Sequence, residues 1–397
     1  MIRGLARRVA HPLGLMRGRD RFSAIADLSR EGPAPLRPEP ELARRERLRI
    51  SVIVPPFGRG SGGLSTILAL VRQIADRGHL CSLWLEDPHR RGPEPGRRVD
   101  RRLREYFGPL PAEVHSGFSS WAGTDIVVAT GWETVARALL LPDCAARVYL
   151  VQDYEPDFFP ASAEARWAER TYSEGLFHVT AGPWLAELLR DRFGARADWF
   201  ALGVDHAVYR PLEVERRNDT VVVYARRSTP RRAVPLALLA LAELYRRRND
   251  IRIVLFGEDH PMRTTFPHRH AGTLPEPELA RLYGEGTVGV SLSLTNYSRV
   301  SQEMMACGLP CVELEVPSVR AALGEEDALT LARFDPLALA DAIERLLDDS
   351  ELRTRRSEAG RRLVADRTWK RAGEQFERCL REAVAGADVV ASTRAHR

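Results

Sequence analysis

Residues 301–313 read SQEMMACGLPCVE and decide the fold that this sequence predicts. Glu303 begins an apolar helical turn, Gly308 ends it, and a buried strand is expected directly afterwards at 311–314. The preceding strand is expected to end near Ser291. Ligands of open α/β sheets bind outside the carboxyl ends of the strands, where a carboxylate can accept two hydrogen bonds from a diol such as a ribose. The structural alternative is an exposed Glu that the helix dipole favours.

Buried strands and amphipathic helices alternate on both sides of this segment. In the first half of the chain, strands are expected at 49–55, 80–85, 125–129, 147–151 and 176–180, and helices at 64–77, 133–140, 163–174 and 183–193. A charged break follows at 209–219. Beyond it, strands are expected at 220–224, 251–256, 270–273, 287–291 and 310–314, and helices at 234–248, 276–283, 300–307, 336–347 and over 351–384. The alternation predicts two doubly wound parallel sheets, with a small-molecule site between the domains.

Composition narrows the class of protein. The chain has 397 residues, of which 44% are hydrophobic and 28% charged, enough apolar material for buried cores. No run of 18 apolar residues suggests a membrane span, and the first residues do not resemble a secretory signal. The five cysteines are mostly far apart, and no His stands near the closest pair. A reduced, cytoplasmic protein is expected, without a disulfide framework or a zinc site.

The N-terminal arm is basic. Residues 1–49 contain twelve Arg against six Asp or Glu. Residues 1–30 could contact an anionic membrane surface from the cytoplasmic side, although a solvated, disordered leader is the interpretation that we favour. The Pro-rich stretch 30–40 is expected to be an extended linker. Nucleic acid is not an expected partner, because Phe22 is the one aromatic residue of the arm and offers no stacking platform.

A glycine-rich loop follows the first strand. Gly58, Gly60 and Gly63 form a GxGxxG pattern, in which glycines let a ligand approach the backbone and the helix N-terminus can bind an anion. This pattern also occurs in NAD-dependent Rossmann enzymes, with Glu86 or Asp87 as candidates for the ribose-binding acid. A nicotinamide-dependent enzyme therefore stays open as an alternative.

Four arginines gather where the first strand of the second domain meets its helix. They are Arg226, Arg227, Arg231 and Arg232. A helix N-terminus disfavours cations unless an anion offsets them. A diphosphate would do so, and guanidinium groups would stabilise the charge that develops on a leaving group. The structural alternative is a solvated basic turn.

Acidic and aromatic side chains alternate after the strand at 147–151. Asp153, Tyr154 and Glu155 lie here, followed by two phenylalanines. Carboxylates and ring faces suit sugar hydroxyls and sugar rings, so we expect the acceptor or the transferred sugar on this side. The carboxylates could also bind a metal, but no His-rich partner segment accompanies them, and no metal is expected.

In their order along residues 49–384, these motifs resemble the retaining glycosyltransferases of the family 4 type. Their signature is a Glu, seven spacer residues and Glu-Ala-Met-Ala-Cys-Gly-x-Pro. The second half is similar to residues 303–310, whereas Thr295 stands in place of the first Glu. Two short sequences, the one around Gln152-Asp153 and the STPR run at 228–231, are most similar to those of the rhamnosyltransferases of bacterial rhamnan and O-polysaccharide synthesis.

The resemblance assigns further residues. Gly62 and Gly63 match the paired glycines near the donor diphosphate, and Thr273 with Leu274 matches the base-binding strand. Arg226 and Arg231 match the family's Gly-Arg-x-x-x-x-Lys stretch. Smaller matches are Gly78-His79, where His79 is expected to be structural, residues 202–205, and Thr368-Trp369.

These matches imply the GT-B fold, with two Rossmann-like domains facing a cleft and a C-terminal helix that crosses back. The implied parts are a basic arm at 1–48, an acceptor-side domain at 49–212, a nucleotide-sugar domain at 213–365, and a crossover helix with a disordered tail at 366–397.

The implied activity is transfer of a sugar, with retention and without metal or cofactor, from a nucleoside diphosphate sugar such as dTDP-L-rhamnose to a bacterial glycan. Glu303 would bind the ribose, and Arg226 and Arg231 would act on the diphosphate. Asn296 or Tyr297 could contact a deoxy sugar. Because Thr295 cannot carry a negative charge, a catalytically weak scaffold that keeps nucleotide binding is the other alternative.

Overall fold

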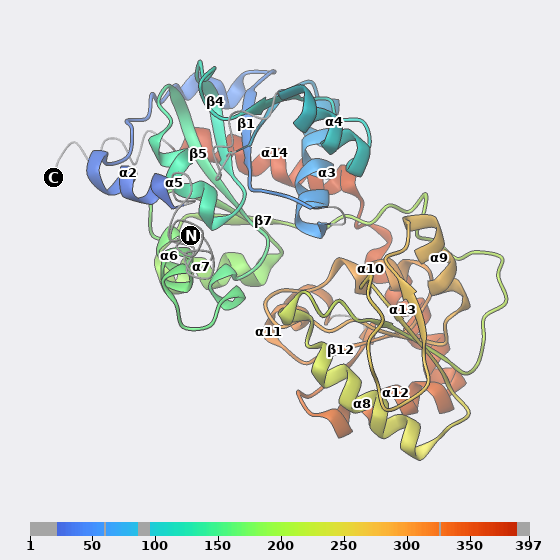
Figure 1. Cartoon of the computed structure of the whole chain (residues 1–397). Coiled ribbons are helices and arrows are strands. Elements are labelled where there is room, and N and C mark those ends of the chain that lie inside the picture. The colour runs from blue at the N-terminus through green and yellow to red at the C-terminus, as the bar shows by residue number, and fades with distance from the viewer. Residues whose placement is uncertain (1–21, 59–60, 86–95, 325–326, 387–397) are drawn as a thin grey trace, which may run out of the picture. The chain divides into compact units, whose positions relative to one another are not determined.

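The computed structural model describes residues 22–58, 61–85, 96–324 and 327–386 (Figure 1). By internal contacts the chain divides into two compact units. The first contains residues 1–150, 174–177 and 377–397, and the second contains residues 151–173 and 178–376. The predicted fold class is confirmed, because the described residues form one seven-stranded and one six-stranded parallel sheet with helices between the strands.

The first sheet has the strand order β3-β2-β1-β4-β5-β6-β7. Its strands are β1 (Arg49–Val54), β2 (Leu80–Leu85), β3 (Glu113–Ser116), β4 (Thr124–Ala129), β5 (Cys144–Val151), β6 (Phe177–Ala181) and β7 (Ala197–Phe200). The central strands β1, β4 and β5 are buried almost throughout, as expected of strands that helices cover on both faces. The order reverses between β1 and β4, so the loop after β1 lies at the switch point of the sheet.

Helices connect the strands of the first sheet. They are α3 (Gly62–Asp76), α4 (Gly96–Phe107), α5 (Trp132–Leu140), α6 (Ala163–Thr171) and α7 (Pro183–Phe193). The N-terminus of α3 is capped by Ser61, whose side chain accepts a hydrogen bond from the backbone of Leu64. Pro183 begins α7, and Gly194, in the left-handed region, ends it.

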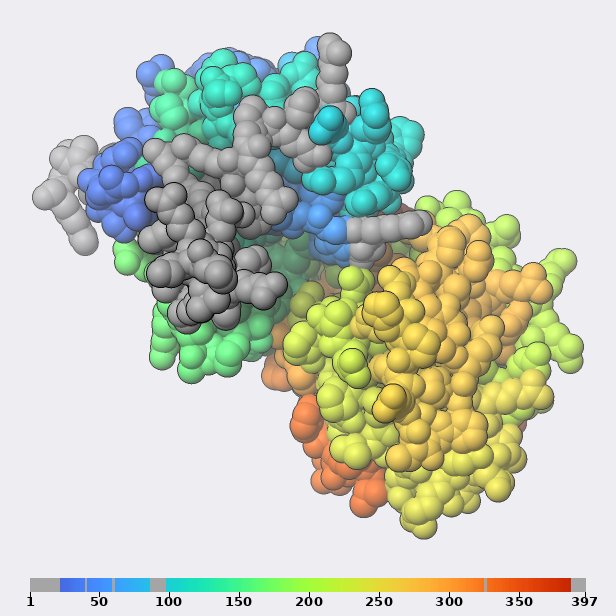
Figure 2. Space-filling model, viewed as in Figure 1, coloured from blue at the N-terminus to red at the C-terminus, as the bar shows by residue number. Residues whose placement is uncertain are grey.

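The second sheet has the order β10-β9-β8-β11-β12-β13. Its strands are β8 (Thr220–Tyr224), β9 (Arg252–Phe256), β10 (Arg269–Gly272), β11 (Val288–Val290), β12 (Cys311–Leu314) and β13 (Leu329–Ala332). Its helices are α8 (Val234–Arg247), α9 (Glu276–Glu285), α10 (Arg299–Ala306), α11 (Pro317–Leu323), α12 (Pro336–Asp348) and α13 (Ser350–Ala365). Aliphatic residues of β8, β9, β11 and β12 pack with those of α8 and α12 into one buried cluster. In the space-filling view, residues coloured yellow to orange form a continuous surface over this part of the second unit (Figure 2).

The expected C-terminal helical region consists of two helices. A break at residues 366–368 separates α13 from α14 (Trp369–Ala385). At the break, Thr368 forms an isolated parallel bridge with Val204. A Cβ on the neighbouring Gly203 would lie 2.6 Å from the backbone nitrogen of Trp369. The close approach of these two segments explains why residue 203 is a glycine.

For residues 22–48, the expected solvated leader is wrong. Helix α2 (Ser23–Glu31) packs against α5, and the ring of Phe22 stacks on that of Trp132 with centroids 5.9 Å apart. The Pro-rich stretch is extended, as expected, and is held against the protein, since Ala34 donates a backbone hydrogen bond to the carbonyl of Leu139. Residues 1–21 lie outside the described residues. The apolar positions of α2 are few, so periodicity alone did not reveal it.

His79 is structural, as expected. Its ring is buried, Nδ1 accepts a hydrogen bond from the backbone N–H of Leu48, and Nε2 lies 3.2 Å from a carboxylate oxygen of Glu377 on α14. Burial opposes ionisation of Glu377. Hydrogen bonds from Arg77, Arg381 and His79 outweigh burial and lower the pKa of this carboxyl to about 2. His79 therefore ties the start of β1 to α14.

All five cysteines are buried thiols without disulfide bonds. Burial raises the pKa of Cys81 and of Cys307 to about 12, so neither thiol is activated as a nucleophile. Among the helices of the described residues, none combines the length and the apolar character needed to cross a bilayer.

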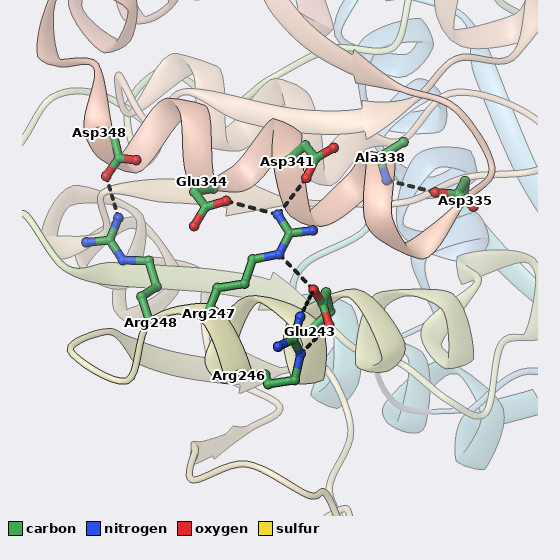
Figure 3. A network of polar contacts seen from close by, with 9 residues as sticks. All are labelled: Glu243, Arg246, Arg247, Arg248, Asp335, Ala338, Asp341, Glu344 and Asp348. Carbon is green, nitrogen blue, oxygen red and sulfur yellow. Dashed lines mark hydrogen bonds and ion pairs between the residues drawn. The ribbon is translucent and has the colours of Figure 1, made fainter.

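A network of ion pairs joins α8 to α12 (Figure 3). Arg247 on α8 lies between Glu243 of its own helix and Asp341 and Glu344 of α12, at 2.8, 2.6 and 3.0 Å. Arg246 pairs with Glu243 only among the residues drawn. Arg248, directly after α8, also pairs with Asp348 at the end of α12. Two guanidinium groups thus link this part of the chain to α12, an arrangement more effective than an isolated surface pair.

Replacement of Arg247 by Met should lower the melting temperature more than replacement of Arg246 by Met, because Arg247 pairs with carboxylates of α12 whereas Arg246 pairs within α8. Thermal unfolding of both variants at low ionic strength measures the difference. It should shrink in about 1 M salt, where charges are screened within about 3 Å. Equal melting temperatures of the two variants at low salt would show that the ion pairs between Arg247 and α12 do not contribute to stability.

Candidate functional site

The candidate site lies where the strand order of the second sheet reverses, between β8 and β11. Both strands end at the same edge, and two loops leave it there, residues 225–233 after β8 and residues 291–298 after β11. Ligands of open α/β sheets bind outside the carboxyl ends of strands at such a switch point. The fold therefore brings the predicted arginine cluster and the segment around Thr295 to one place.

The first part of the β8 loop carries Arg226, which is half-buried, and Arg227, which is exposed. The backbone N–H of Ser228 donates a 2.9 Å hydrogen bond to the carboxylate of Glu258. This bond is the main cause of the lowered pKa of Glu258. Glu258 thus fixes the backbone of this loop at Ser228, directly after the two arginines.

Arg231 lies in the short 3-10 turn Pro230–Arg232, which leads into α8 through Ala233 with φ of +46°. Its Nε is 3.4 Å from Oδ2 of Asp153, and its guanidinium stacks on the ring of Phe158 at 4.5 Å. The Arg231 side chain is 29% exposed and that of Asp153 is 19% exposed. Burial lowers the pKa of Arg231, and the Asp153 carboxylate acts in the opposite direction. The Arg231 side chain is therefore a partly desolvated cation with one nearby carboxylate.

Arg232 points toward the β11 loop. Its guanidinium contacts Oγ of Ser293, and it lies over the ring of Tyr224 at 5.5 Å. The β8 and β11 loops are also joined by backbone, since Leu294 donates a 3.1 Å hydrogen bond to the carbonyl of Arg231. The two loops thus form one connected surface.

Thr295 is buried, and its hydroxyl donates a 2.8 Å hydrogen bond to Oδ1 of Asp153. The two oxygens of one carboxylate therefore face two partners, the hydroxyl of Thr295 and the guanidinium of Arg231. The position where the family signature has an acid is occupied by a hydroxyl that binds an acid from another segment.

Asn296 and Tyr297 are both buried, and protein groups satisfy their polar atoms. Asn296 Nδ2 donates to the carbonyls of Gln152 and Ala181 at 2.7 and 2.8 Å, and the hydroxyl of Tyr297 accepts from the backbone of Leu202 at 3.0 Å. Their predicted contact with a deoxy sugar stays a prediction. In this structure they anchor the β11 loop.

Tyr297 also packs against a glycine that ends β6. Gly182 has φ of +94°, and a Cβ there would lie 2.6 Å from Cε1 of the Tyr297 ring. Both the backbone conformation and the lack of space require glycine at this position.

Of the three candidate residues on the acceptor side, Asp153 alone contacts an arginine of the β8 loop. The hydroxyl of Tyr154 accepts a 2.9 Å hydrogen bond from Arg192 and lies 3.4 Å from Glu169. Glu155 is buried, and its backbone N–H donates to the hydroxyl of Tyr172. Tyr154 and Glu155 therefore take part in packing around α6 and α7, and a role in sugar binding stays a prediction for both.

Glu303 lies on α10, whose N-terminus is capped by Ser298. Its side chain is almost fully buried and pairs with Arg299 one turn earlier at 2.8 Å. Burial raises the pKa of Glu303 to about 7, against the opposing charge of Arg299. A carboxyl that titrates near neutral pH is a common property of functional sites, although the Arg299 pair is equally compatible with a structural role.

Glu313 was not among the predicted site residues, yet it organises this edge of the sheet. Its fully buried carboxylate accepts hydrogen bonds from the backbone of Ser293 and Leu314 and from the hydroxyl of Ser301, at 2.8, 3.1 and 3.1 Å. Burial raises its pKa to about 8, while the Leu314 N–H and the charge of Arg232 oppose the shift. The available signal was a Glu within an otherwise apolar buried strand.

The remaining predicted residues lie apart from these contacts. Thr273 is exposed and Leu274 half-buried after β10, and the hydroxyl of Thr273 bonds to Asp259, which lowers the pKa of that carboxyl. Gly62 and Gly63 begin α3 in the first unit. Their roles stay predictions. Gly60, Glu86 and Asp87, on which the nicotinamide alternative depends, lie outside the described residues.

Two further observations delimit the site. In the part of the chain that the structure describes, no group of three or more His, Cys, Asp and Glu side chains is arranged to bind a metal. A cavity of about 510 Å³ in the second unit is lined by residues of α13 and of the segment 206–211 and does not include the arginine cluster. The groups described above gather at the switch point and do not line this cavity.

The fold class is that of two parallel α/β sheets with helices between their strands, and the structural neighbours have the GT-B fold. Solved structures with this fold include sucrose-phosphate synthase from Thermosynechococcus elongatus, with a TM-score of 0.66, 17% identity, and coverage of 86% of this chain and 100% of that chain. HepE of Anabaena, solved with UDP-glucose, has a TM-score of 0.65 and 14% identity over 84% of this chain and all of HepE. At these identities the likeness concerns the fold.

Sequence comparisons identify the relatives more specifically. The family described as "WsaF, C-terminal domain" matches residues 219–344. The O-antigen biosynthesis protein RfbC of Myxococcus xanthus is 29% identical over 254 residues, covering 62% of this chain and 20% of RfbC. D-inositol 3-phosphate glycosyltransferase of Frankia alni is 28% identical over 224 residues, covering 49% of this chain and 55% of that protein. The chain thus spans a fifth to about half of these relatives, and none of them favours the nicotinamide alternative.

Substitution of Glu313 by Gln should change how stability depends on pH. In the unfolded chain the pKa of a Glu carboxyl is about 4.3. In the folded protein, burial raises the pKa of Glu313 to about 8. The folded state therefore favours the protonated form, and the stability that this gives is present at low pH and lost as pH rises toward about 8. Gln keeps the acceptor oxygen and does not titrate. Relative to wild type, its free energy of unfolding should rise by on the order of 1 kcal/mol per pH unit across this window.

Urea unfolding at several pH values between about 5 and 8 measures this difference. Glu278→Gln, which removes an exposed carboxyl of α9, is the matched control. Parallel pH profiles for wild type and Glu313→Gln would contradict the proposed burial cost.

Proposed function

We propose that this protein is a glycosyltransferase that moves a sugar from a nucleoside diphosphate sugar to a glycan acceptor. One observation carries the proposal: a partly desolvated guanidinium, Arg231, stands at the switch point of the second sheet beside Arg226 and Arg232. Three cations at this edge suit an anion with more than one negative charge. The fold and the named relatives supply the class of reaction.

In this reaction the bond between the anomeric carbon and the diphosphate oxygen breaks, and a bond from the acceptor oxygen to that carbon forms. The leaving diphosphate gains negative charge, which Arg226 and Arg231 would stabilise more strongly in the transition state than in the ground state. The proton of the acceptor hydroxyl passes to the leaving diphosphate. With retention, the acceptor arrives on the face from which the diphosphate departs, and no protein nucleophile or metal is needed.

The donor that we propose is dTDP-L-rhamnose, and the acceptor is a growing bacterial polysaccharide. The support is the similarity to RfbC, whose name places it in O-antigen biosynthesis, and to the WsaF C-terminal domain. Glu303 would bind the ribose hydroxyls, and Thr273 with Leu274 would lie near the base. Gly62 and Gly63, which begin α3, keep the role near the donor diphosphate that the resemblance implies. The reaction is proposed for the cytoplasm, where residues 1–30 would contact anionic lipid.

A nucleotide-binding scaffold with little activity is the second candidate, and Thr295 favours it. An acid at this position could bind sugar hydroxyls, whereas the Thr295 hydroxyl is already bonded to Asp153. The scaffold would bind nucleoside diphosphates but cleave no donor.

Removal of the arginines should reduce turnover far more than folding. We expect Arg226→Ala and Arg231→Ala each to lower kcat/KM by roughly 10²–10³-fold, the effect typical of losing one group that stabilises developing charge. The assay is release of nucleoside diphosphate from a panel of dTDP and UDP sugars in the presence of acceptor glycans. Arg281→Ala, on the exposed face of α9, should have wild-type turnover. Wild-type rates in both site variants would exclude the assignment, and binding without release from any donor would favour the scaffold.

Nucleotide affinity should increase as pH rises through about 7, because the Glu303 carboxyl must ionise to accept two hydrogen bonds from the ribose. Calorimetric titration with dTDP or UDP measures the affinity. The ratio of wild-type to Glu303→Gln affinity should rise on the order of tenfold between about pH 6 and 8, the range in which a group of this pKa ionises. The ratio removes the titration of the nucleotide phosphate itself. A ratio independent of pH would exclude Glu303 from the ribose site.

A further inference from the structure

The Asp153 carboxylate engages the site from two directions. Oδ1 accepts the 2.8 Å hydrogen bond from the hydroxyl of Thr295, and Oδ2 lies 3.4 Å from Nε of Arg231. Both side chains of the ion pair are largely withdrawn from solvent, and the ring of Phe158 covers one face of the guanidinium. Asp153 comes from the segment after β5, whereas its two partners come from the β8 and β11 loops.

The geometry of this pair is weaker than its burial would allow. Charge-assisted N–H···O hydrogen bonds are typically about 2.7–2.9 Å long, so the 3.4 Å separation is a near contact rather than an optimal bond. In addition, Nε of Arg231 has no hydrogen-bond partner of good geometry, although it is buried. A buried cation that is held by one distant carboxylate can gain free energy by exchanging it for a closer anion.

We propose that Asp153 is an internal counter-anion, which neutralises Arg231 until the diphosphate of the donor replaces it. Two anions compete for one guanidinium, because a carboxylate and a phosphate a few ångströms apart repel each other in a partly desolvated site. Donor binding would therefore displace Oδ2 from Arg231. Thr295 would retain Oδ1, so the carboxylate would turn about a fixed hydrogen bond instead of leaving the site.

After this displacement, Oδ2 of Asp153 is free to accept a new hydrogen bond. Oδ2 would become an acceptor for a hydroxyl of the transferred sugar, at the position that Thr295 itself cannot serve with a charge. The exchange would explain why the Asp153 carboxylate lies beside Thr295, a residue that has no carboxylate of its own. Asp153 thus competes with other anions for Arg231 while the donor site is empty. Once the diphosphate is bound, the same carboxylate binds a hydroxyl of the substrate.

This inference rests on the proposed function for its second half, but its first half concerns binding alone. Asp153→Asn keeps the size of the side chain and an oxygen that can accept from Thr295, and it removes the charge. We expect it to bind dTDP or UDP about tenfold more tightly than wild type, since the competitor for Arg231 is gone. We expect it to lower kcat for sugar transfer by about 100-fold, since a charged acceptor for the sugar hydroxyl is lost.

Opposite signs for binding and turnover distinguish this role from a structural one, which would weaken both. Asp157→Asn is the matched control, because Asp157 is an exposed carboxylate of the same segment, whereas the carboxylate beside Arg231 is that of Asp153. It should leave both quantities unchanged. Asp153→Ser, which also keeps an acceptor for Thr295 without charge, serves as the second variant if the Asn variant does not fold.

A double-mutant cycle tests whether Asp153 acts on nucleotide binding through Arg231. In an Arg231→Met background, Asp153→Asn should no longer increase nucleotide affinity, because the competition has been removed. Nucleotide affinity that is unchanged or lower in Asp153→Asn with native Arg231 would overturn the exchange. Tighter nucleotide binding with no donor cleaved by the wild-type protein would support the exchange and refute the proposed function. Tighter binding with undiminished kcat would overturn the role of Asp153 toward the sugar.

Discussion

A guanidinium that is withdrawn from water requires a nearby negative charge, and this requirement governs the carboxyl edge of the second sheet. The chain turns from β8 into α8 through Pro230–Arg232, which puts Arg231 under the ring of Phe158 and out of bulk solvent. The cost of that position is offset by Asp153. The same desolvation would make an interaction between Arg231 and a phosphate stronger than it would be at an exposed surface.

Glu313 solves the related problem of ordering the loop that faces these cations. Loops that leave a parallel strand have backbone groups without sheet partners, and they need side chains to satisfy them. One buried carboxylate satisfies the N–H of Ser293 and the hydroxyl of Ser301, and so it connects the start of the β11 loop to α10. Asn296 performs the same task at the other end of the loop, through the carbonyls of Gln152 and Ala181. Both side chains thus order the loop that faces the arginine cluster.

The sequence predicted the elements whose hydrophobic pattern is strong and missed those that depend on tertiary contacts. Strands β2 and β8 and helix α7 were predicted to the residue, because apolar runs are bounded there by Gly, Pro or charged residues. Strands β3, β7 and β13 are short and lie away from the sheet centres, where fewer apolar residues are needed, and α2 is held by packing on α5. In the site, the arginines and Glu303 could be predicted from residue type and position. The bond between Thr295 and Asp153 could not, because 142 residues separate its partners.

The glycine at the end of β6 has an evolutionary consequence. Gly182 cannot acquire a side chain while an aromatic ring occupies the adjacent space, and its positive φ penalises most replacements in any case. Tyr297, in turn, cannot shrink without leaving a void beneath the loop that carries Thr295. Among homologous sequences the two positions should therefore covary, with a larger residue at 182 accompanied by a smaller one at 297. Such correlated change would mark the sequences that keep this loop geometry.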